Sequence, residues 1–121
     1  MRRRTYRQMR AASEGSLHHY VYVVLLHARA GKLRKVLAEN PTRDPNKPCV
    51  YVGMTGLSPE QRFANHKAGI KSASVVRKYG ERLVPVLYEH LNPMTYKDAV
   101  RLEAELAESL RKRGFVVFGG H

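Results

Sequence analysis

The feature that most constrains the fold of this chain is the stretch 49–66, with the sequence CVYVGMTGLSPEQRFANH. Its apolar run at 50–53 is typical of a buried strand. Residues 55–57, with Gly56 at their centre, have the composition of a turn, and regular structure resumes at Ser58. The stretch therefore predicts a strand whose end is held close to the start of a helix.

Both ends of this helix are marked in the sequence. The hydroxyl of Ser58 can cap the first turn, and Gln61 has the spacing of a capping box. Pro59 suits the first helical position because its missing N–H would have no partner there. Gly69 is the expected end, because glycine adopts the left-handed conformation common in C-terminal caps.

Three polar side chains should converge where the strand meets this helix. Arg62 and His66 lie four residues apart, so a helix places the guanidinium and the imidazole on one face. Tyr51 lies on the preceding strand. We expect the phenol, the guanidinium and the imidazole at one spot.

The composition indicates which kind of partner this site binds. A length of 121 residues with 43% hydrophobic and 26% charged residues fits one domain with a modest core. Twenty-two Lys and Arg against ten Asp and Glu give a net charge of +12, which favours a polyanionic partner, most often nucleic acid. The alternative is a basic surface that only keeps the protein soluble.

The single cysteine excludes an internal disulfide, and the beginning of the sequence lacks the long apolar run of a secretory signal or membrane span. We therefore expect a cytoplasmic protein that does not enter membranes.

Residues 1–16 carry five Arg and one Glu without apolar periodicity, which predicts a flexible basic arm ahead of a folded domain over 17–121. The arm either orders on a phosphate backbone or adds only diffuse charge.

A first strand is predicted at 17–26, where β-branched and aromatic residues are frequent. Alternation places Tyr20, Tyr22 and Val24 on one face. If this strand pairs antiparallel with 50–53, Tyr22 and Tyr51 share that face. Tyrosines in strands are more often packing residues than catalytic ones.

The connection between these strands is too long for a tight turn. Helical spacing at 33–37 predicts one or two helical turns, and three prolines within 41–48 exclude regular structure there. This basic insertion is either a flap that contacts a substrate or a solvated loop.

The remaining elements follow from local signals. A short helix is predicted at 74–79 and a third strand at 82–91, which Pro85 should confine to a sheet edge. Thr95 should cap a long helix that runs to about Arg113, and a last strand-like piece follows at 115–118.

The long helix contains one anomaly. Its apolar stripe also includes Glu103. A buried carboxylate without compensation costs several kcal/mol, so Glu103 requires a partner. That partner is either an Arg in a structural ion pair or a metal ion at the mouth of a cleft.

Two short segments, Tyr20-Val21-Tyr22 and Tyr51-Val52-Gly53, precede Arg62, His66 and Glu103 in a characteristic order and spacing. In these residues the chain resembles the GIY-YIG nucleases over 18–121. The resemblance implies an α/β fold of the α+β type, with a small antiparallel three-stranded sheet flanked by helices.

The resemblance further implies a metal-dependent endonuclease that cleaves DNA phosphodiesters with Mg²⁺ or Mn²⁺. Its catalytic residues would be Tyr22, Tyr51, Arg62, His66 and Glu103. A single carboxylate, Glu103, suits Mg²⁺ because this ion keeps water ligands and accepts phosphate oxygens. The Arg62 fork would neutralise transition-state charge. Either Tyr22 or Tyr51 would orient or deprotonate the attacking water, and His66 would hydrogen-bond a tyrosine or relay its proton.

One metal site breaks one strand per event, and the chain shows no helix-turn-helix or zinc module that would hold a duplex. We therefore expect single-stranded or locally opened DNA as the preferred partner. The candidate contacts to its backbone are Arg2, Arg3, Arg4, Arg7, Lys67 and Lys71.

Three departures from the family's pattern limit what the resemblance implies, and the second and third of them favour an alternative, a binding module of the same fold without catalysis. Tyr20 replaces the glycine of the first motif, and Met54 replaces a basic residue that often follows the second. An asparagine common near the C-terminus has no counterpart in 114–117. The intact set of five site residues argues for the nuclease.

Overall fold

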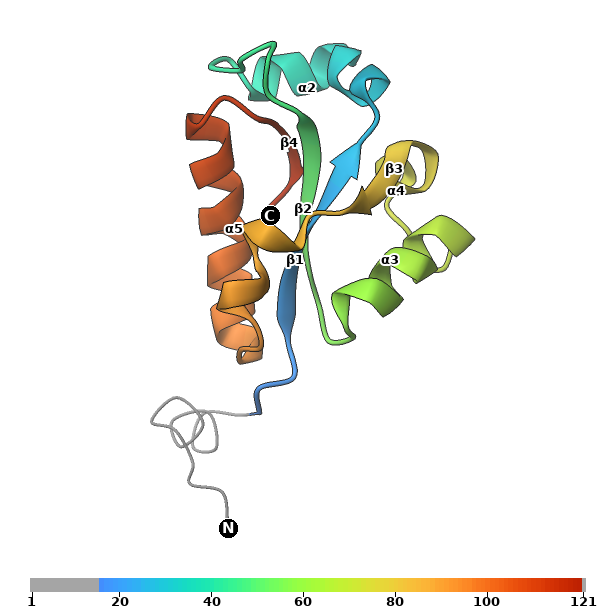
Figure 1. Cartoon of the computed structure of the whole chain (residues 1–121), viewed down its shortest axis with the longest axis vertical. Helices are drawn as coiled ribbons and strands as arrows, with labels where there is room; N and C mark the ends of the chain where they lie inside the picture. The colour runs from blue at the N-terminus through green and yellow to red at the C-terminus, as the bar shows by residue number, and fades with distance from the viewer. Residues whose placement is uncertain (1–15, 121) are drawn as a thin grey trace.

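The structure, a computed structural model, describes residues 16–120 (Figure 1). Most of the predicted basic arm, with Arg2, Arg3, Arg4 and Arg7, lies outside the described residues. The four strands are β1 (Tyr20–Leu26), β2 (Cys49–Thr55), β3 (Gly80–Leu83) and β4 (Val116–Gly119). The α-helices are α2 (Arg34–Glu39), α3 (Pro59–Ala68), α4 (Ser74–Tyr79) and α5 (Tyr96–Lys112), and short 3-10 helices lie at η1 (Ala28–Lys32), η2 (Pro85–Leu87) and η3 (Glu89–Leu91).

The strands form one mixed sheet in the order β3-β1-β2-β4. β1 pairs antiparallel with β2 and β3, whereas β4 pairs parallel with β2. The expected α+β class is confirmed. The expected three-stranded antiparallel sheet is wrong, because the segment at 115–118 joins the sheet as a fourth, parallel strand.

The third strand is shorter than predicted. β3 ends at Leu83, and the chain then turns through η2 and η3 before Asn92. Pro85 begins η2, so it lies just beyond the strand, but β3 does form an edge of the sheet, as expected. The run looked strand-like because it is rich in valine and leucine, yet Val86 is 74% exposed.

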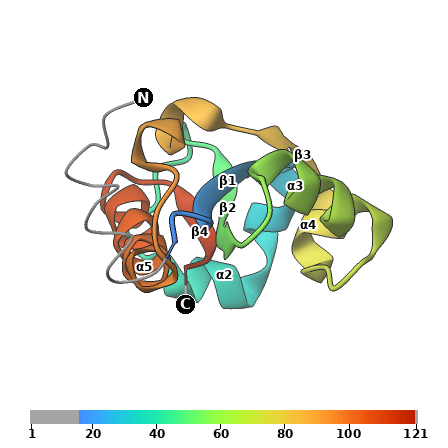
Figure 2. The same ribbon diagram turned by 90° about the horizontal axis from the view of Figure 1, so that it is seen from below.

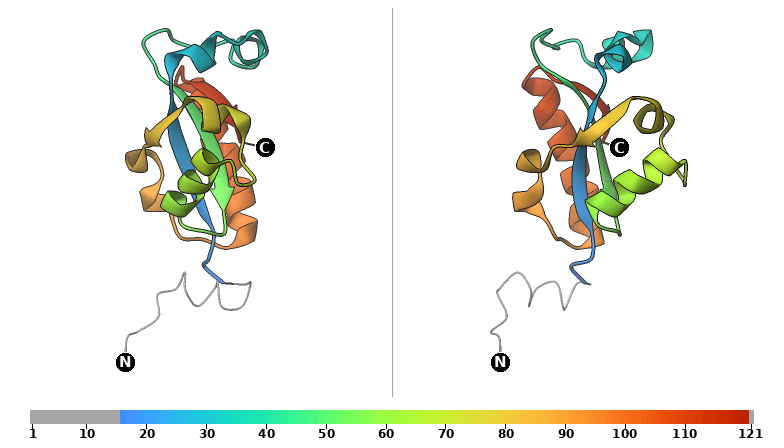
Figure 3. Two further views of the ribbon diagram at one scale, coloured as in Figure 1. Left: turned by 90° about the vertical axis from the view of Figure 1, so that its right-hand side faces the viewer. Right: turned by 45° about the vertical axis from the view of Figure 1, so that its right-hand side comes forward.

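Helices cover both sides of the sheet. α3 and α4 lie together on one side and α5 lies on the other, as Figures 2 and 3 show from two directions. The core between them consists mainly of valines from β1, β2 and β4 with small and aliphatic residues from the helices. Those with no exposed surface include Val21, Val23, Val52, Val117, Val76, Ala99, Ala107 and Leu110.

The predicted cap residues are confirmed, but the Gln61 side chain donates to Asn65 Oδ1 at 3.0 Å, and no contact among the described residues completes the capping box with Ser58. Ser58 Oγ accepts the Gln61 N–H at 3.1 Å, and Thr95 Oγ1 accepts the Asp98 N–H at 3.1 Å. Gly69 ends α3 in the left-handed conformation, with φ of 80°. Within residues 16–120, no helix is long and apolar enough to cross a bilayer.

Candidate active site

Tyr22 and Tyr51 lie on the same face of the sheet, as the alternation predicted. In the β1–β2 ladder Tyr22 is opposite Gly53 and Val24 is opposite Tyr51, so the two phenols are diagonal neighbours with ring centroids 6.2 Å apart. Tyr22 is 1% exposed, whereas Tyr51 is only partly buried. Tyr51 is therefore the phenol of the pair that a ligand can contact.

Gly53 makes room for the inner tyrosine. The Tyr22 ring lies across this residue, and a Cβ placed on Gly53 would come within 2.5 Å of the Tyr22 hydroxyl oxygen. The glycine after Val52 is thus required by a close approach between side chain and backbone.

His66 connects the inner tyrosine to the loop between α3 and α4. Its Nε2 lies 2.8 Å from the Tyr22 hydroxyl oxygen, and its Nδ1 accepts the Ala73 N–H at 3.0 Å. Because a backbone N–H can only donate, Nδ1 must be the unprotonated nitrogen. We therefore assign the ring proton to Nε2, which donates a hydrogen bond to the Tyr22 hydroxyl oxygen.

The surroundings of His66 favour this neutral form. The side chain has no exposed surface, and burial together with the nearby Arg62 charge lowers the pKa of His66 to about 4. At neutral pH the imidazole is uncharged, with one donor and one acceptor, both in use.

Arg62 is fixed by the loop that follows its own helix. Its guanidinium donates to the carbonyl oxygens of Ile70 at 3.3 Å and Lys71 at 2.9 Å. The guanidinium also lies within hydrogen-bonding reach of the Tyr22 hydroxyl. These contacts use only part of its five donor hydrogens, which leaves donors for a ligand. The Arg62 charge lowers the pKa of both Tyr22 and Tyr51, which indicates that it lies close to the phenols.

Glu103 is buried in α5, as its position in the apolar stripe predicted, with 7% of its surface exposed. Its negative charge raises the pKa of Tyr22 and of Tyr51, so the carboxylate lies within electrostatic range of both phenols. The fold therefore brings together all five predicted site residues, from β1, β2, α3 and α5.

Both tyrosines are protonated at neutral pH in this arrangement. Burial is the largest cause that raises the pKa of each, and Glu103 adds to it, while Arg62 acts in the opposite direction. Either phenol can donate a hydrogen bond. To act as a base, either one would require additional positive charge nearby.

The metal donors near the tyrosines are few. Within residues 16–120, no three or more His, Cys, Asp and Glu side chains form a ready-made cage. The single carboxylate of Glu103 fits Mg²⁺, which binds through one or two carboxylates and completes its shell with water and substrate phosphate oxygens.

Of the two predicted backbone contacts in the described region, Lys71 adjoins this site, whereas Lys67 faces the end of α4. The Lys67 ammonium donates to the carbonyl oxygens of Arg77 at 3.0 Å and Gly80 at 2.9 Å, so it ties down the end of α4 and keeps one donor for a phosphate. Lys71 is exposed, and its carbonyl accepts from Arg62.

Sequence reasoning missed two groups that position the site. The Ala73 N–H fixes His66 through the main chain, which leaves no side-chain signal. The Asn92 side chain pairs with the edge of β1 beside Tyr22: its Nδ2 donates to the Val21 oxygen at 2.8 Å and its Oδ1 accepts the Val21 N–H at 2.9 Å. The Asn-Pro pair after a predicted strand is the signal that could have drawn attention to Asn92.

Comparison with known proteins identifies no relative of this chain. No model of a known protein family matches it, and no curated protein or solved structure matches it significantly.

Proposed function

We propose that this chain is a metal-dependent endonuclease of the GIY-YIG type, which hydrolyses DNA phosphodiester bonds. The observation that carries the proposal is the convergence of a partly exposed phenol, a fixed guanidinium and a buried carboxylate from three separate elements. These groups suit the binding and polarisation of a phosphate. The net charge of +12 suits a polyanion such as DNA, to which that phosphate belongs.

Arg62 is the phosphate-binding residue in this proposal. Its guanidinium is already held by two carbonyls, so little conformational entropy is lost when its remaining N–H groups donate to phosphate oxygens. Because the donors are oriented before the reaction, they can stabilise the charge that develops in the transition state.

Tyr51 is the tyrosine that meets the attacking water. Tyr22 is 1% exposed and accepts the hydrogen bond of His66 Nε2, so it serves to orient Tyr51 rather than to touch substrate. In the free protein Tyr51 is protonated, because burial and Glu103 raise its pKa. It therefore orients water by hydrogen bonding, and it becomes a base only when positive charge gathers beside it.

Glu103 would hold the divalent cation. A bound Mg²⁺ or Mn²⁺ would neutralise phosphate charge and offset the Glu103 charge that opposes ionisation of Tyr51. Because Glu103 is 7% exposed, few water molecules would compete with the phosphate oxygens for the cation beside it.

The preferred substrate is single-stranded or locally opened DNA. One carboxylate site acts on one phosphodiester per event, and the described chain has a single set of these residues. Residues 16–120 also fold as one sheet with its flanking helices and contain no second module that would hold a duplex.

The test is a cleavage assay with the full chain on matched labelled substrates: single strand, intact duplex and duplex with a central unpaired region. At equal salt and with Mg²⁺, we expect cutting of the single strand and of the opened duplex, and no cutting in EDTA. Simultaneous cutting of both strands without a nicked intermediate would reject the one-strand mechanism. Binding of all substrates without any cutting would favour the non-catalytic binding module.

A further inference from the structure

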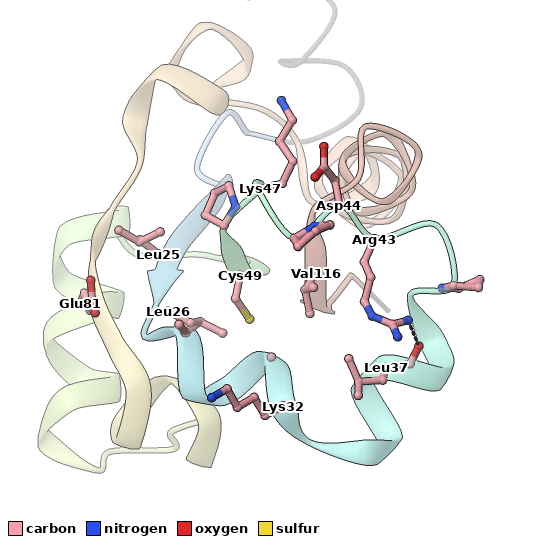
Figure 4. A pocket seen from close by; sticks show the side chains of 15 residues that line it. Leu25, Leu26, Lys32, Leu37, Arg43, Asp44, Lys47, Cys49, Glu81 and Val116 are labelled. Atoms are coloured by element: carbon pink, nitrogen blue, oxygen red, sulfur yellow. Dashed lines mark hydrogen bonds between the residues drawn. The ribbon is translucent and has the colours of Figure 1, made fainter.

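A cavity of about 740 Å³ opens between the start of β2 and the insertion that joins β1 to β2 (Figure 4). Its volume lies in the range of small-molecule sites. None of the five residues of the candidate active site lines it. The cavity is therefore a separate feature of the molecule.

The floor of this cavity is apolar and neutral. Leu26, Cys49 and Val116 form it, from three adjacent strands, and the Cys49 sulfur points into the open space (Figure 4). Burial raises the pKa of the Cys49 thiol to about 12, so the sulfur carries no charge at neutral pH. Such a floor suits a planar or aliphatic body.

Two cations at the edge are available to an anion. Arg43 Nη1 donates to the carbonyl oxygens of Leu37 and Asn40, both at 3.1 Å, which fixes the guanidinium. Its Nε and Nη2 have no hydrogen bond within residues 16–120. The Lys32 ammonium makes no hydrogen bond or ion pair within the same part of the chain. A third cation, Lys47, lies 5.6 Å from the Phe115 ring centroid and is engaged there.

Two carboxylates, Asp44 and Glu81, also line the cavity. Asp44 Oδ1 accepts the Asn46 N–H at 2.8 Å, whereas Glu81, on β3, has no hydrogen bond or ion pair from its side chain among the described residues. It would repel a purely anionic amphiphile such as a fatty acid. It would instead accept hydrogen bonds from a ligand that carries N–H groups away from its anionic end.

We propose that this cavity binds a nucleotide. The phosphate lies on Lys32 at the rim, Arg43 adds positive charge from another part of the rim, the base lies against the floor at Cys49, and the base N–H groups face Glu81. The nucleotide is either a free mononucleotide or an unpaired nucleotide of a longer strand, since the two share this chemistry. The inference does not depend on the proposed hydrolysis.

The test titrates the isotopically labelled full chain in EDTA with dAMP, with a short single-stranded oligo-dA and with inorganic phosphate, followed by amide NMR shifts. We expect dAMP or oligo-dA to shift the amides of Gly31, Cys49 and Val116, and to bind more tightly than inorganic phosphate. Shifts with oligo-dA alone assign the site to strands, and shifts with dAMP assign it to free nucleotides as well. Absence of shifts with both ligands, or equal binding of inorganic phosphate, overturns the proposal.

Matched variants at Gly31 test the floor. A Cβ placed here would lie 3.8 Å from the Cys49 sulfur and 3.9 Å from Val116, at ordinary contact distance. Gly31→Ala should therefore bind nearly as the natural chain does, whereas Gly31→Leu fills the cavity and should weaken binding at least about tenfold. Unchanged binding by a Gly31→Leu variant with a native-like amide spectrum overturns the proposal.

Matched charge reversals test the edge. Lys32→Glu should weaken dAMP binding about tenfold, because it removes a charge-assisted contact. Lys35→Glu changes the net charge equally but lies outside the cavity lining, and should have little effect. Equal losses in the two variants would indicate general electrostatics and overturn the site. A chain that binds dAMP here yet cleaves no DNA keeps this inference and rejects only the nuclease.

Discussion

The imidazole of His66 donates its Nε2 hydrogen to the Tyr22 hydroxyl oxygen across 2.8 Å, because the Ala73 N–H already occupies Nδ1. Transfer of the Tyr22 proton to His66 would therefore require the imidazole to give up one of these bonds. Of the two roles expected from the sequence, the geometry favours the hydrogen bond over the relay. His66 is a positioning residue, which holds the inner tyrosine in place.

Two amide variants should separate the contacts of His66. Gln places its amide nitrogen near the Nε2 position, so His66→Gln can still donate to Tyr22. Asn places its oxygen near the Nδ1 position, so His66→Asn can still accept from Ala73 but not reach Tyr22. We expect the Gln variant to retain more cleavage than the Asn variant, at similar thermal stability. Nitrogen NMR shifts of the natural protein should show protonated Nε2, and protonated Nδ1 would contradict the assignment.

Acid should destabilise the protein through His66. Its pKa falls from an ordinary 6.5 to about 4 on folding, so the unfolded state binds the proton more tightly. Stability from this group is present above pH 6.5 and is lost as the pH falls toward 4, by up to about 3 kcal/mol. The check is the free energy of unfolding in urea between pH 7 and pH 4. His66→Gln should flatten this part of the profile, and an unchanged profile would contradict the prediction.

Glu103→Gln should lower the cleavage rate at least about 100-fold while DNA binding is retained, because the amide keeps the shape but loses the charge that holds a cation. The matched control is Glu105→Gln, which removes an exposed carboxylate that pairs with Arg101 on the same helix. Rates follow from single-turnover cleavage and affinities from binding in EDTA. Near-natural turnover of the Glu103→Gln variant with Mg²⁺ would reject the metal assignment.

Arg62→Lys should be nearly as damaging to cleavage as Arg62→Ala. An ammonium keeps the charge, but it cannot donate to Ile70, Lys71 and a phosphate in the same fixed plane. We expect both variants to lose about 100-fold in rate. Arg77→Lys, an exposed change nearby, serves as the control. Activity retained by the Arg62→Lys variant would reduce Arg62 to a source of general electrostatic attraction.

DNA affinity should fall steeply with salt, because a chain of net charge +12 releases counterions when it neutralises phosphates. Removal of residues 1–10, which hold five Arg, should make the logarithmic slope shallower by at most about 0.7 to 0.9 for each Arg removed. Fluorescence anisotropy over a salt series measures both slopes. A slope near zero for the full chain would remove the main physical support for a nucleic-acid partner.

Local signals were sufficient for the parts of the fold that short-range chemistry determines. Ser58, Thr95 and Gly69 mark helix ends because caps satisfy backbone groups within a few residues. The shared face of Tyr22 and Tyr51 followed from the two-residue period of strands. The burial of Glu103 followed from the helical period of its apolar neighbours.

The features that the sequence did not predict depend on contacts between distant segments. The Val84 N–H still donates to the Val23 carbonyl oxygen at 2.9 Å, but the position on β1 that Val86 would need is occupied at Val21 by the Asn92 side chain. The segment Val116–Gly119 was recognised as strand-like, yet neither its partner nor its parallel direction is encoded in its own pattern. The role of Ala73 arises from its main chain alone.

The parallel pairing of β4 with β2 also bears on how the molecule folds. Leu26 and Cys49, which close the β1–β2 ladder, are 23 positions apart, whereas Cys49 and its β4 partner Val116 are 67 positions apart. Closing the longer loop costs more chain entropy, and pairings between distant segments slow folding. We expect β2 to pair with β1 first. The other edge of β2 then stays unpaired and apolar until β4 pairs with it. That interval is when the chain is most prone to associate with other copies of itself.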